Sequence, residues 1–190
     1  MRSFLGWAKK RAIILATYAI LLAVLAGIYL YRLQGLIPGL NPTEQGVVER
    51  VDAYQYPWRN PVDAPFVTLS KALHMLGVDS LLAARLTSAA LMIISVVMFY
   101  QLLRNWLISP GKSLVGASLF ATSSWALVLG RGAHPIVAGI FLLMLVFSLS
   151  TRLYFTTHPF LDWILFIGAS VLSLYTPLSV WLIFLALLVY

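Results

Sequence analysis

The 190-residue chain contains no cysteine and few charged side chains. The absence of cysteine excludes disulfide bonds, thiolate metal sites and cysteine nucleophiles. Charged residues make up only 10% of the chain, whereas 61% of it is hydrophobic. A soluble domain of this size needs a polar outer shell, which such a composition does not supply. The sequence therefore predicts an integral membrane protein.

The apolar residues are gathered in runs of roughly 17 to 24, the length of a helix that crosses about 30 Å of hydrocarbon. We predict one all-α, polytopic membrane domain with about six spans. The predicted spans are residues 12–31, 80–103, 113–129, 135–153, 160–174 and, incompletely, 178–190. Because the last run is too short to span, we expect further chain beyond Tyr190.

One long polar stretch, residues 32–79, follows the first predicted span and holds five of the six acidic residues. Two short amphipathic helices are predicted within it, at residues 42–55 and 64–76. Asn41 suits the N-cap of the first, Pro42 its first helical position, and Glu44 the return contact of a capping box. Both helices are too short to span, so we expect them to lie along the membrane surface.

The net charge of +7 does not indicate nucleic-acid binding, because the basic residues are scattered between the apolar runs. Anchoring at the membrane interface explains them better. The basic cluster in residues 1–11 predicts a cytoplasmic N-terminus in the cytoplasmic membrane, with residues 32–79 external. A signal peptide is the alternative for the first run. Its length, and the absence of small residues at a cleavage site around Tyr31, favour a retained helix.

Five short motifs carry a resemblance to a known family: Pro42-Thr43-Glu44, Asn60-Pro61 with Pro65-Phe66, Gly77 with Ala84-Arg85-Leu86-Thr87-Ser88-Ala89, Ser124-Trp125 with Arg131-Gly132-Ala133-His134-Pro135, and Leu174-Tyr175-Thr176-Pro177. The chain also has a first span, a loop with two surface helices and then closely spaced later spans. In these motifs and in this order it is similar to the GT-C superfamily of membrane glycosyltransferases, such as protein O-mannosyltransferases and aminoarabinose transferases, which use polyprenyl-phosphate sugars.

The resemblance implies transfer of a sugar from a polyprenyl-phosphate donor to an external acceptor. Such chemistry needs a carboxylate near the acceptor hydroxyl, and cations or a divalent metal near the departing phosphate. It implies a catalytic role for Glu44, with Asp52 on the same helix face as a second acid. It implies phosphate contacts for Arg131, His134 and Arg85. We expect Glu44 and Arg131 to face one external cavity.

Two positions depart from the family's pattern. Thr43 stands where a catalytic aspartate is expected, and Ile136 and Val137 stand where an acid often begins the fourth span. Threonine is no carboxylate base, so a non-catalytic scaffold or subunit of the same fold is the alternative function. A transporter is a further alternative, which the lack of paired broken helices opposes.

A structural role is the alternative for each candidate residue. Glu44 could be only a capping residue, Arg85 and Arg131 could reach to the interface, and His134 could be an ordinary loop residue. The sequence contains no metal-ligand cluster of recognised spacing, so the cofactor stays open. The sugar, the acceptor and the oligomeric state stay open too. We expect the 190-residue chain by itself to be inactive, because the family's donor cavity needs more spans.

Overall fold

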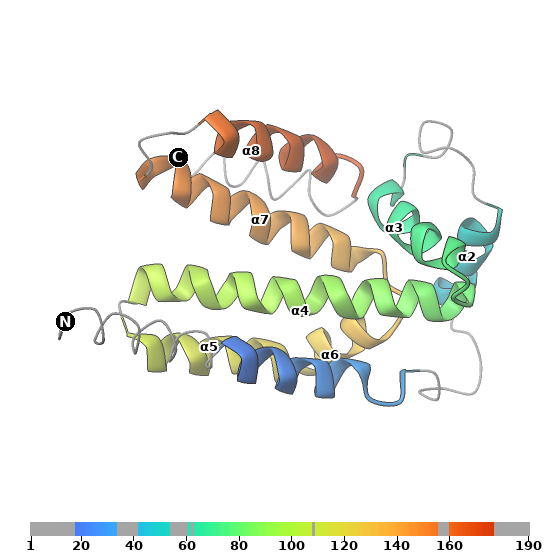
Figure 1. Ribbon diagram of the computed structural model, residues 1–190, viewed down its shortest axis with the longest axis horizontal. Coiled ribbons are helices and arrows are strands. Elements are labelled where there is room, and N and C mark those ends of the chain that lie inside the picture. The colour runs from blue at the N-terminus through green and yellow to red at the C-terminus, as the bar shows by residue number, and fades with distance from the viewer. Residues whose placement is uncertain are drawn as a thin grey trace, which may run out of the picture.

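The computed structural model of the chain describes residues 18–33, 42–53, 61, 63–107, 109–155 and 160–176. Within these ranges the regular structure is entirely helical, as predicted. Figure 1 shows an elongated bundle with two short helices across one end. The basic N-terminal cluster, the beginning of the first predicted span and the partial sixth span lie outside the described residues.

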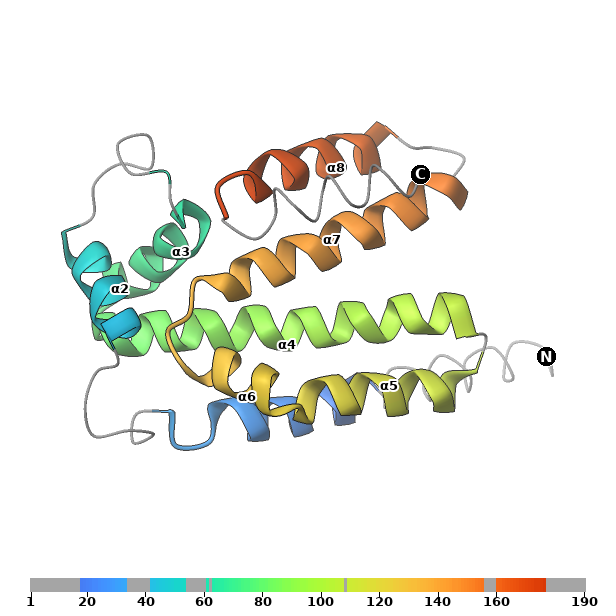
Figure 2. The ribbon, with the colours of Figure 1, turned by 180° about the vertical axis from the view of Figure 1, so that it is seen from behind.

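Eight described helices make up the bundle. They are a first helix, Tyr18–Leu30, and then α2 (Pro42–Asp52), α3 (Ala64–Met75), α4 (Ser80–Leu107), α5 (Pro110–Thr122), α6 (Ser124–Arg131), α7 (Ile136–Phe155) and α8 (Phe160–Ser173). The long helix α4 is central and packs against all of α2, α3, α5, α6 and α7. In both views, α7 and α8 lie on one side of α4, and α5 with the first helix lies on the other (Figures 1 and 2).

Two of the described helices are long and apolar enough to cross a membrane. They are α4, with 28 residues, and the 18-residue segment Ile136–Leu153 of α7. These correspond to the predicted spans 80–103 and 135–153. The described parts of the first and fifth predicted spans, Tyr18–Leu30 and Phe160–Ser173, are shorter apolar helices. The described residues therefore contain two candidate spans, or three with a bent pair, rather than the six predicted from hydropathy.

The third predicted span, residues 113–129, is not one straight helix. α5 and α6 meet at Ser123 with a bend of 60°. Ser123 is extended, and its hydroxyl accepts the N–H of Ala126 at 3.3 Å, so it caps α6. The hydroxyl of Tyr29 donates to the carbonyl of Ala121 at 2.8 Å. This bond satisfies one of the carbonyl groups that a helix end leaves without an intrahelical partner.

Small and hydroxylated side chains let the neighbouring helices approach α4 closely. Ala84, Ala89, Ser88 and Ser95 are all fully buried on it. The hydroxyl of Ser95 donates to the Leu91 carbonyl one turn earlier at 2.7 Å. Small residues at helix contacts, with hydroxyls satisfied within their own helix, are typical of packing between membrane helices.

The outer surface of α8 is almost entirely apolar. Phe160 is 78% exposed and Leu161 is 65% exposed, whereas Asp162 and Ser173 of the same helix are buried. Polar side chains thus face the bundle and large apolar ones face outwards. Contiguous apolar surface of this kind is unfavourable in water and favourable in lipid, so it agrees with an integral membrane protein.

The short helices predicted at residues 42–55 and 64–76 correspond to α2 and α3, which lie across the end of the bundle where α4 begins (Figure 1). α2 buries Val47 and Val51, as its amphipathic pattern predicts. Asp63 precedes α3 with φ 60°, and its carboxylate binds Nη1 of Arg50 on α2 at 3.0 Å. The N–H of Asp63 donates to the carbonyl of Tyr175 at 3.1 Å. These contacts fix both short helices to the bundle.

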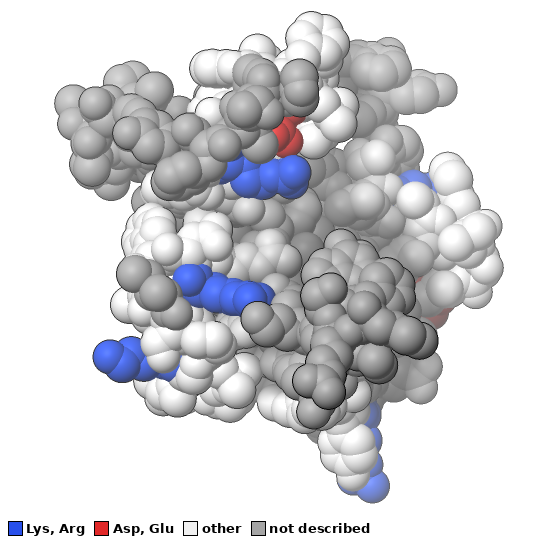
Figure 3. All heavy atoms as spheres, turned by 60° about the vertical axis from the view of Figure 1, so that its left-hand side comes forward, with Lys and Arg blue, Asp and Glu red and all other residues white. Residues whose placement is uncertain are grey.

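The opposite end of the bundle is predominantly basic among the described residues. Arg104 lies in the last turn of α4, Lys112 in the first turn of α5, and Arg152 in the last turn of α7. Arg152 lies 3.8 Å from the carboxylate of Asp162, in the first turn of α8. Figure 3 turns this end towards the viewer and shows lysine and arginine side chains on it. The positive-inside rule makes this end the expected cytoplasmic side.

Candidate functional site

Glu44 and Arg85 form a buried ion pair at the end of the bundle that α2 covers. Nε of Arg85 donates to Oε1 of Glu44, and Nη2 donates to Oε2, each at 3.0 Å. Both side chains are only 3% exposed. This fork-to-fork geometry is the strongest arrangement between arginine and a carboxylate, and a buried pair needs such compensation for its lost hydration. Arg85 therefore does not reach out to the interface, which was the structural alternative for it.

The ion pair connects four segments of the chain. Nη1 of Arg85 donates to the carbonyl of Leu33, just after the first helix, at 3.0 Å. Oε1 of Glu44 also accepts the N–H of Ala133, between α6 and α7, at 3.0 Å. α2, α4, the end of the first helix and the α6–α7 connection thus meet at this pair. Asn41, the partner of Glu44 in the predicted capping box, lies outside the described residues.

Arg131, the last residue of α6, lies two residues before the Ala133 N–H that binds Glu44. Its Nη2 donates to the carbonyl of Tyr31 at 2.8 Å. Its Nε is buried and has no hydrogen-bond partner, the one such side-chain atom in the described part of the chain. Leaving a buried donor unsatisfied costs about 1–3 kcal/mol, and more for a charged group. Arg131 therefore carries a donor that would gain from an incoming acceptor.

His134 begins the approach to α7 on the same connection. Its backbone N–H donates to the hydroxyl of Ser88 on α4 at 3.2 Å. Burial lowers the pKa of His134 below 6.5, and the negative charge of Glu44 opposes this shift without cancelling it. At neutral pH the ring is therefore uncharged and offers one N–H donor and one acceptor nitrogen.

The structure brings four of the five predicted site residues together at one end of the bundle: Glu44, Arg85, Arg131 and His134. Asp52 lies at the same end of the bundle but outside this cluster. It is exposed at the end of α2, about 12 Å along the helix axis from Glu44 at 1.5 Å per residue. A cavity of about 500 Å³ that the described residues line includes none of these five side chains. The shared cavity expected for Glu44 and Arg131 stays a prediction.

Sequence reasoning treated Glu44 and Arg85 as separate candidates and missed their pairing. The available signal was the rule that an ionisable residue at membrane depth pairs with an opposite charge or a backbone carbonyl. It also missed Arg32, whose guanidinium carbon lies 5.7 Å from the centre of the Tyr31 ring. Arg131 binds the carbonyl of Tyr31, and Arg32 directly follows Tyr31 in the chain. Arg32 therefore adds a second positive charge near Arg131.

No group of three or more histidine, aspartate and glutamate side chains suited to a metal ion occurs among the described residues. Comparisons of the chain with protein-family models, with curated proteins and with solved structures find no match.

Proposed function

We propose that this end of the bundle binds the phosphate of a polyprenyl-linked sugar, as the N-terminal membrane part of a glycosyltransferase that acts on an external acceptor. The observation that carries the proposal is the buried Nε of Arg131, which has no hydrogen-bond partner. A phosphate oxygen is a natural acceptor for it, because the planar guanidinium fork suits phosphate and its attraction is strong where water is excluded.

The local charge balance supports an anionic ligand. Glu44 compensates Arg85 directly through its two oxygens. Arg131 instead donates to the neutral backbone carbonyl of Tyr31, and Arg32 is the next residue in the chain. Arg131 and Arg32 thus place positive charge beside the Tyr31 carbonyl, and this local charge attracts a lipid phosphate. The neutral ring of His134 could add one hydrogen bond.

Within this proposal Glu44 is a positioning residue rather than the catalytic base. Its carboxylate accepts three N–H bonds, from Arg85 and Ala133, and is 3% exposed. Such a group is poorly placed to take a proton from an acceptor hydroxyl, which must first come within hydrogen-bond reach. Glu44 instead holds the α6–α7 connection that carries Arg131 and His134.

The same observation favours a second candidate, a non-catalytic membrane subunit of this fold that binds the lipid phosphate without transferring the sugar. Thr43, at the position where the family carries its aspartate, agrees with it. A transporter is less supported. At the break at Ser123, two carbonyls near the end of α5 are bonded within the protein. The Tyr29 hydroxyl donates to the Ala121 carbonyl, and the Ser123 hydroxyl donates to the Phe120 carbonyl. Ion sites at broken helices need such carbonyls free.

Binding of a fluorescent polyprenyl phosphate to the 190-residue chain in nanodiscs tests the proposal. Arg131→Gln should weaken binding about tenfold, equivalent to about 1.4 kcal/mol. Arg152→Gln, at the opposite end of the bundle, is the matched control and should bind like the wild type. Equal binding by both variants would contradict a phosphate site at Arg131. Where binding is confirmed, sugar transfer by membranes that carry the protein separates the enzyme from the non-catalytic subunit.

A further inference from the structure

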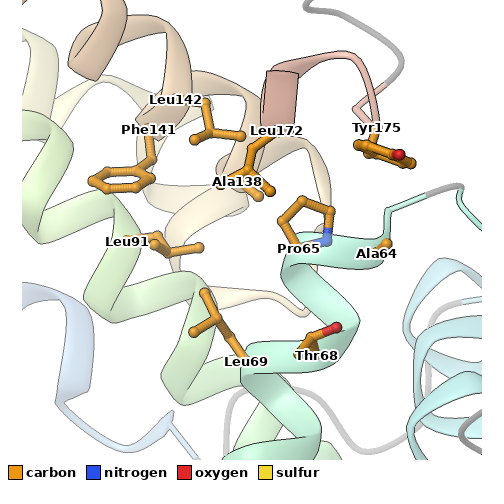
Figure 4. Close-up of a pocket in the computed structure, with 10 residues that line it drawn as sticks. All are labelled: Ala64, Pro65, Thr68, Leu69, Leu91, Ala138, Phe141, Leu142, Leu172 and Tyr175. Carbon is orange, nitrogen blue, oxygen red and sulfur yellow. The ribbon is translucent and has the colours of Figure 1, made fainter. Parts of the chain in front are cut away.

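A second site lies away from the charged cluster, as a slot of about 500 Å³ between α3, α4, α7 and α8. Figure 4 shows its ten lining residues, which carry no charge. Their only polar side-chain groups are the hydroxyls of Thr68 and Tyr175. The volume falls in the range of about 300–1,000 Å³ typical of ligand sites. A ligand part that fits this slot must be almost wholly hydrocarbon.

The slot has an apolar end and a polar end. In Figure 4, Phe141 and Leu91 lie at one end, and Ala64 and Tyr175 lie at the other. Asp63 directly precedes Ala64, and its N–H binds the carbonyl of Tyr175. The polar end therefore adjoins the ion pair of Asp63 with Arg50.

Arg50 offers a positive charge at this polar end. Its Nε donates to the carbonyl of Gly46 at 2.9 Å, and its Nη1 donates to Asp63 at 3.0 Å. These bonds fix the guanidinium and leave the Nη2 donors for another acceptor. The side chain of Arg50 is 33% exposed, against 12% for Asp63, so the cation is the more accessible partner.

The exposed edges of the slot are apolar, which suits hydrocarbon better than water. On α3, Leu69 is 48% exposed, and the apolar surface continues along the helix to Met75 at 71% exposed. On α8, Leu172 is 48% exposed at the opposite edge. The slot also runs beside α4 and α7, the two candidate membrane spans. We therefore expect a molecule that enters it to come from the bilayer.

We propose that the slot holds one acyl chain of an anionic glycerophospholipid of the membrane, with the lipid phosphate on Arg50. The apolar lining suits a hydrocarbon chain, and the volume of about 500 Å³ is enough for part of one such chain. The charge of Arg50 complements the phosphate. The lipid would fasten α3 to the bundle, and the site is independent of the sugar donor proposed at Arg131.

Native mass spectrometry of the detergent-purified 190-residue chain, titrated with phosphatidylglycerol or phosphatidylcholine, tests this inference. One phosphatidylglycerol should bind in preference to phosphatidylcholine. Leu172→Trp partly fills the slot and should weaken binding about tenfold. Ile164→Trp, at a similarly exposed site on α8 that does not line the slot, should leave it unchanged. Arg50→Gln should remove the headgroup preference, and Arg32→Gln should keep it.

If Leu172→Trp and Ile164→Trp retain equal amounts of lipid, the lipid binds to the general apolar surface of the protein. That result would overturn the proposed site in the slot. Equal binding of the two phospholipids by the wild type would overturn the role of Arg50. A third arm adds undecaprenyl phosphate. Its displacement of phosphatidylglycerol at equal concentration would identify a polyprenyl site instead, and failure to displace it supports the phospholipid.

Discussion

The ring of Tyr29 lies directly over Gly130, so that a Cβ added to Gly130 would lie 2.5 Å from Cε1 of Tyr29 and 2.9 Å from Cγ of Met92. Tyr29 and Met92 are both fully buried, so neither side chain has free space into which it could move. The same tyrosine binds the Ala121 carbonyl at the bend between α5 and α6. The missing side chain of Gly130 thus lets the first helix support the break.

Gly130→Ala should therefore destabilise the protein by about 1–3 kcal/mol, the usual cost of overpacking a core. Thermal unfolding in detergent measures it. Gly168→Ala is the matched control, because it is also a helical glycine and a Cβ there meets nothing within 4 Å. That variant should be neutral or more stable by up to about 1 kcal/mol. Equal melting temperatures for the two variants would show that the Tyr29 contact is not tight.

Stability should fall as the pH drops through the range in which His134 titrates. Because burial lowers the pKa of His134 below 6.5, the unfolded chain takes up the proton at a higher pH than the folded chain. The stabilisation is therefore fully present above pH 6.5 and is lost as the pH falls towards the lower folded pKa. His134→Gln should flatten this part of the profile. Melting temperatures between about pH 7.5 and about pH 5.5 measure the difference, and parallel profiles would contradict it.

Local signals in the sequence were sufficient for the short helices and for the start of α4. Pro42 and Pro65 each lie at a helix beginning, and α2 and α3 form where predicted. Asp79, directly before α4, is a residue type that favours the N-cap, and its carboxylate accepts the N–H groups of Leu81 and Leu82 at 3.2 and 3.4 Å. Capping depends on neighbours in sequence, so one sequence can reveal it.

Features that depend on distant contacts could not be predicted in this way. Hydropathy does not distinguish a continuous apolar helix from two helices at an angle, so the bend at Ser123 was missed. Its stabilising partner, Tyr29, is 92 residues from Ala121. Similarly, nothing local in the sequence connects Glu44 with Arg85, because the packing of α2 against α4 brings them together. The candidate residues were identified one by one, but their arrangement required the fold.

Cysteine labelling in intact cells should place α2 and α3 outside the cytoplasmic membrane. Gln45→Cys on α2 and Lys71→Cys on α3 replace exposed or partly exposed polar residues and should react with an impermeant thiol reagent. Ser70→Cys is the matched control on α3, because Ser70 is fully buried and should react only after unfolding. Lys112→Cys, at the basic end of the bundle, should react only after the cells are opened. Reaction of Lys112→Cys alone in intact cells would invert the orientation.

The buried ion pair of Glu44 and Arg85 should behave as one coupled unit, so that removal of either partner alone costs more than the pair itself contributes to stability. Removing one partner by Glu44→Gln or Arg85→Met leaves the other polar group buried at 3% exposure without its counterpart. Each change should cost about 3–5 kcal/mol. The double variant Glu44→Met with Arg85→Met removes both charges and should cost clearly less than the sum of the single changes, because no unpaired charge remains.

Unfolding in mixed detergent micelles measures the coupling between the two residues. The double-mutant cycle compares the wild type, Glu44→Met, Arg85→Met and the double variant. Arg152→Gln breaks the pair with Asp162 at the far end of the bundle, where the arginine is 62% exposed and the atoms are 3.8 Å apart. Exposed pairs contribute little, so this control should unfold almost like the wild type. If the costs of Glu44→Met and Arg85→Met simply add in the double variant, the two side chains do not act as one unit.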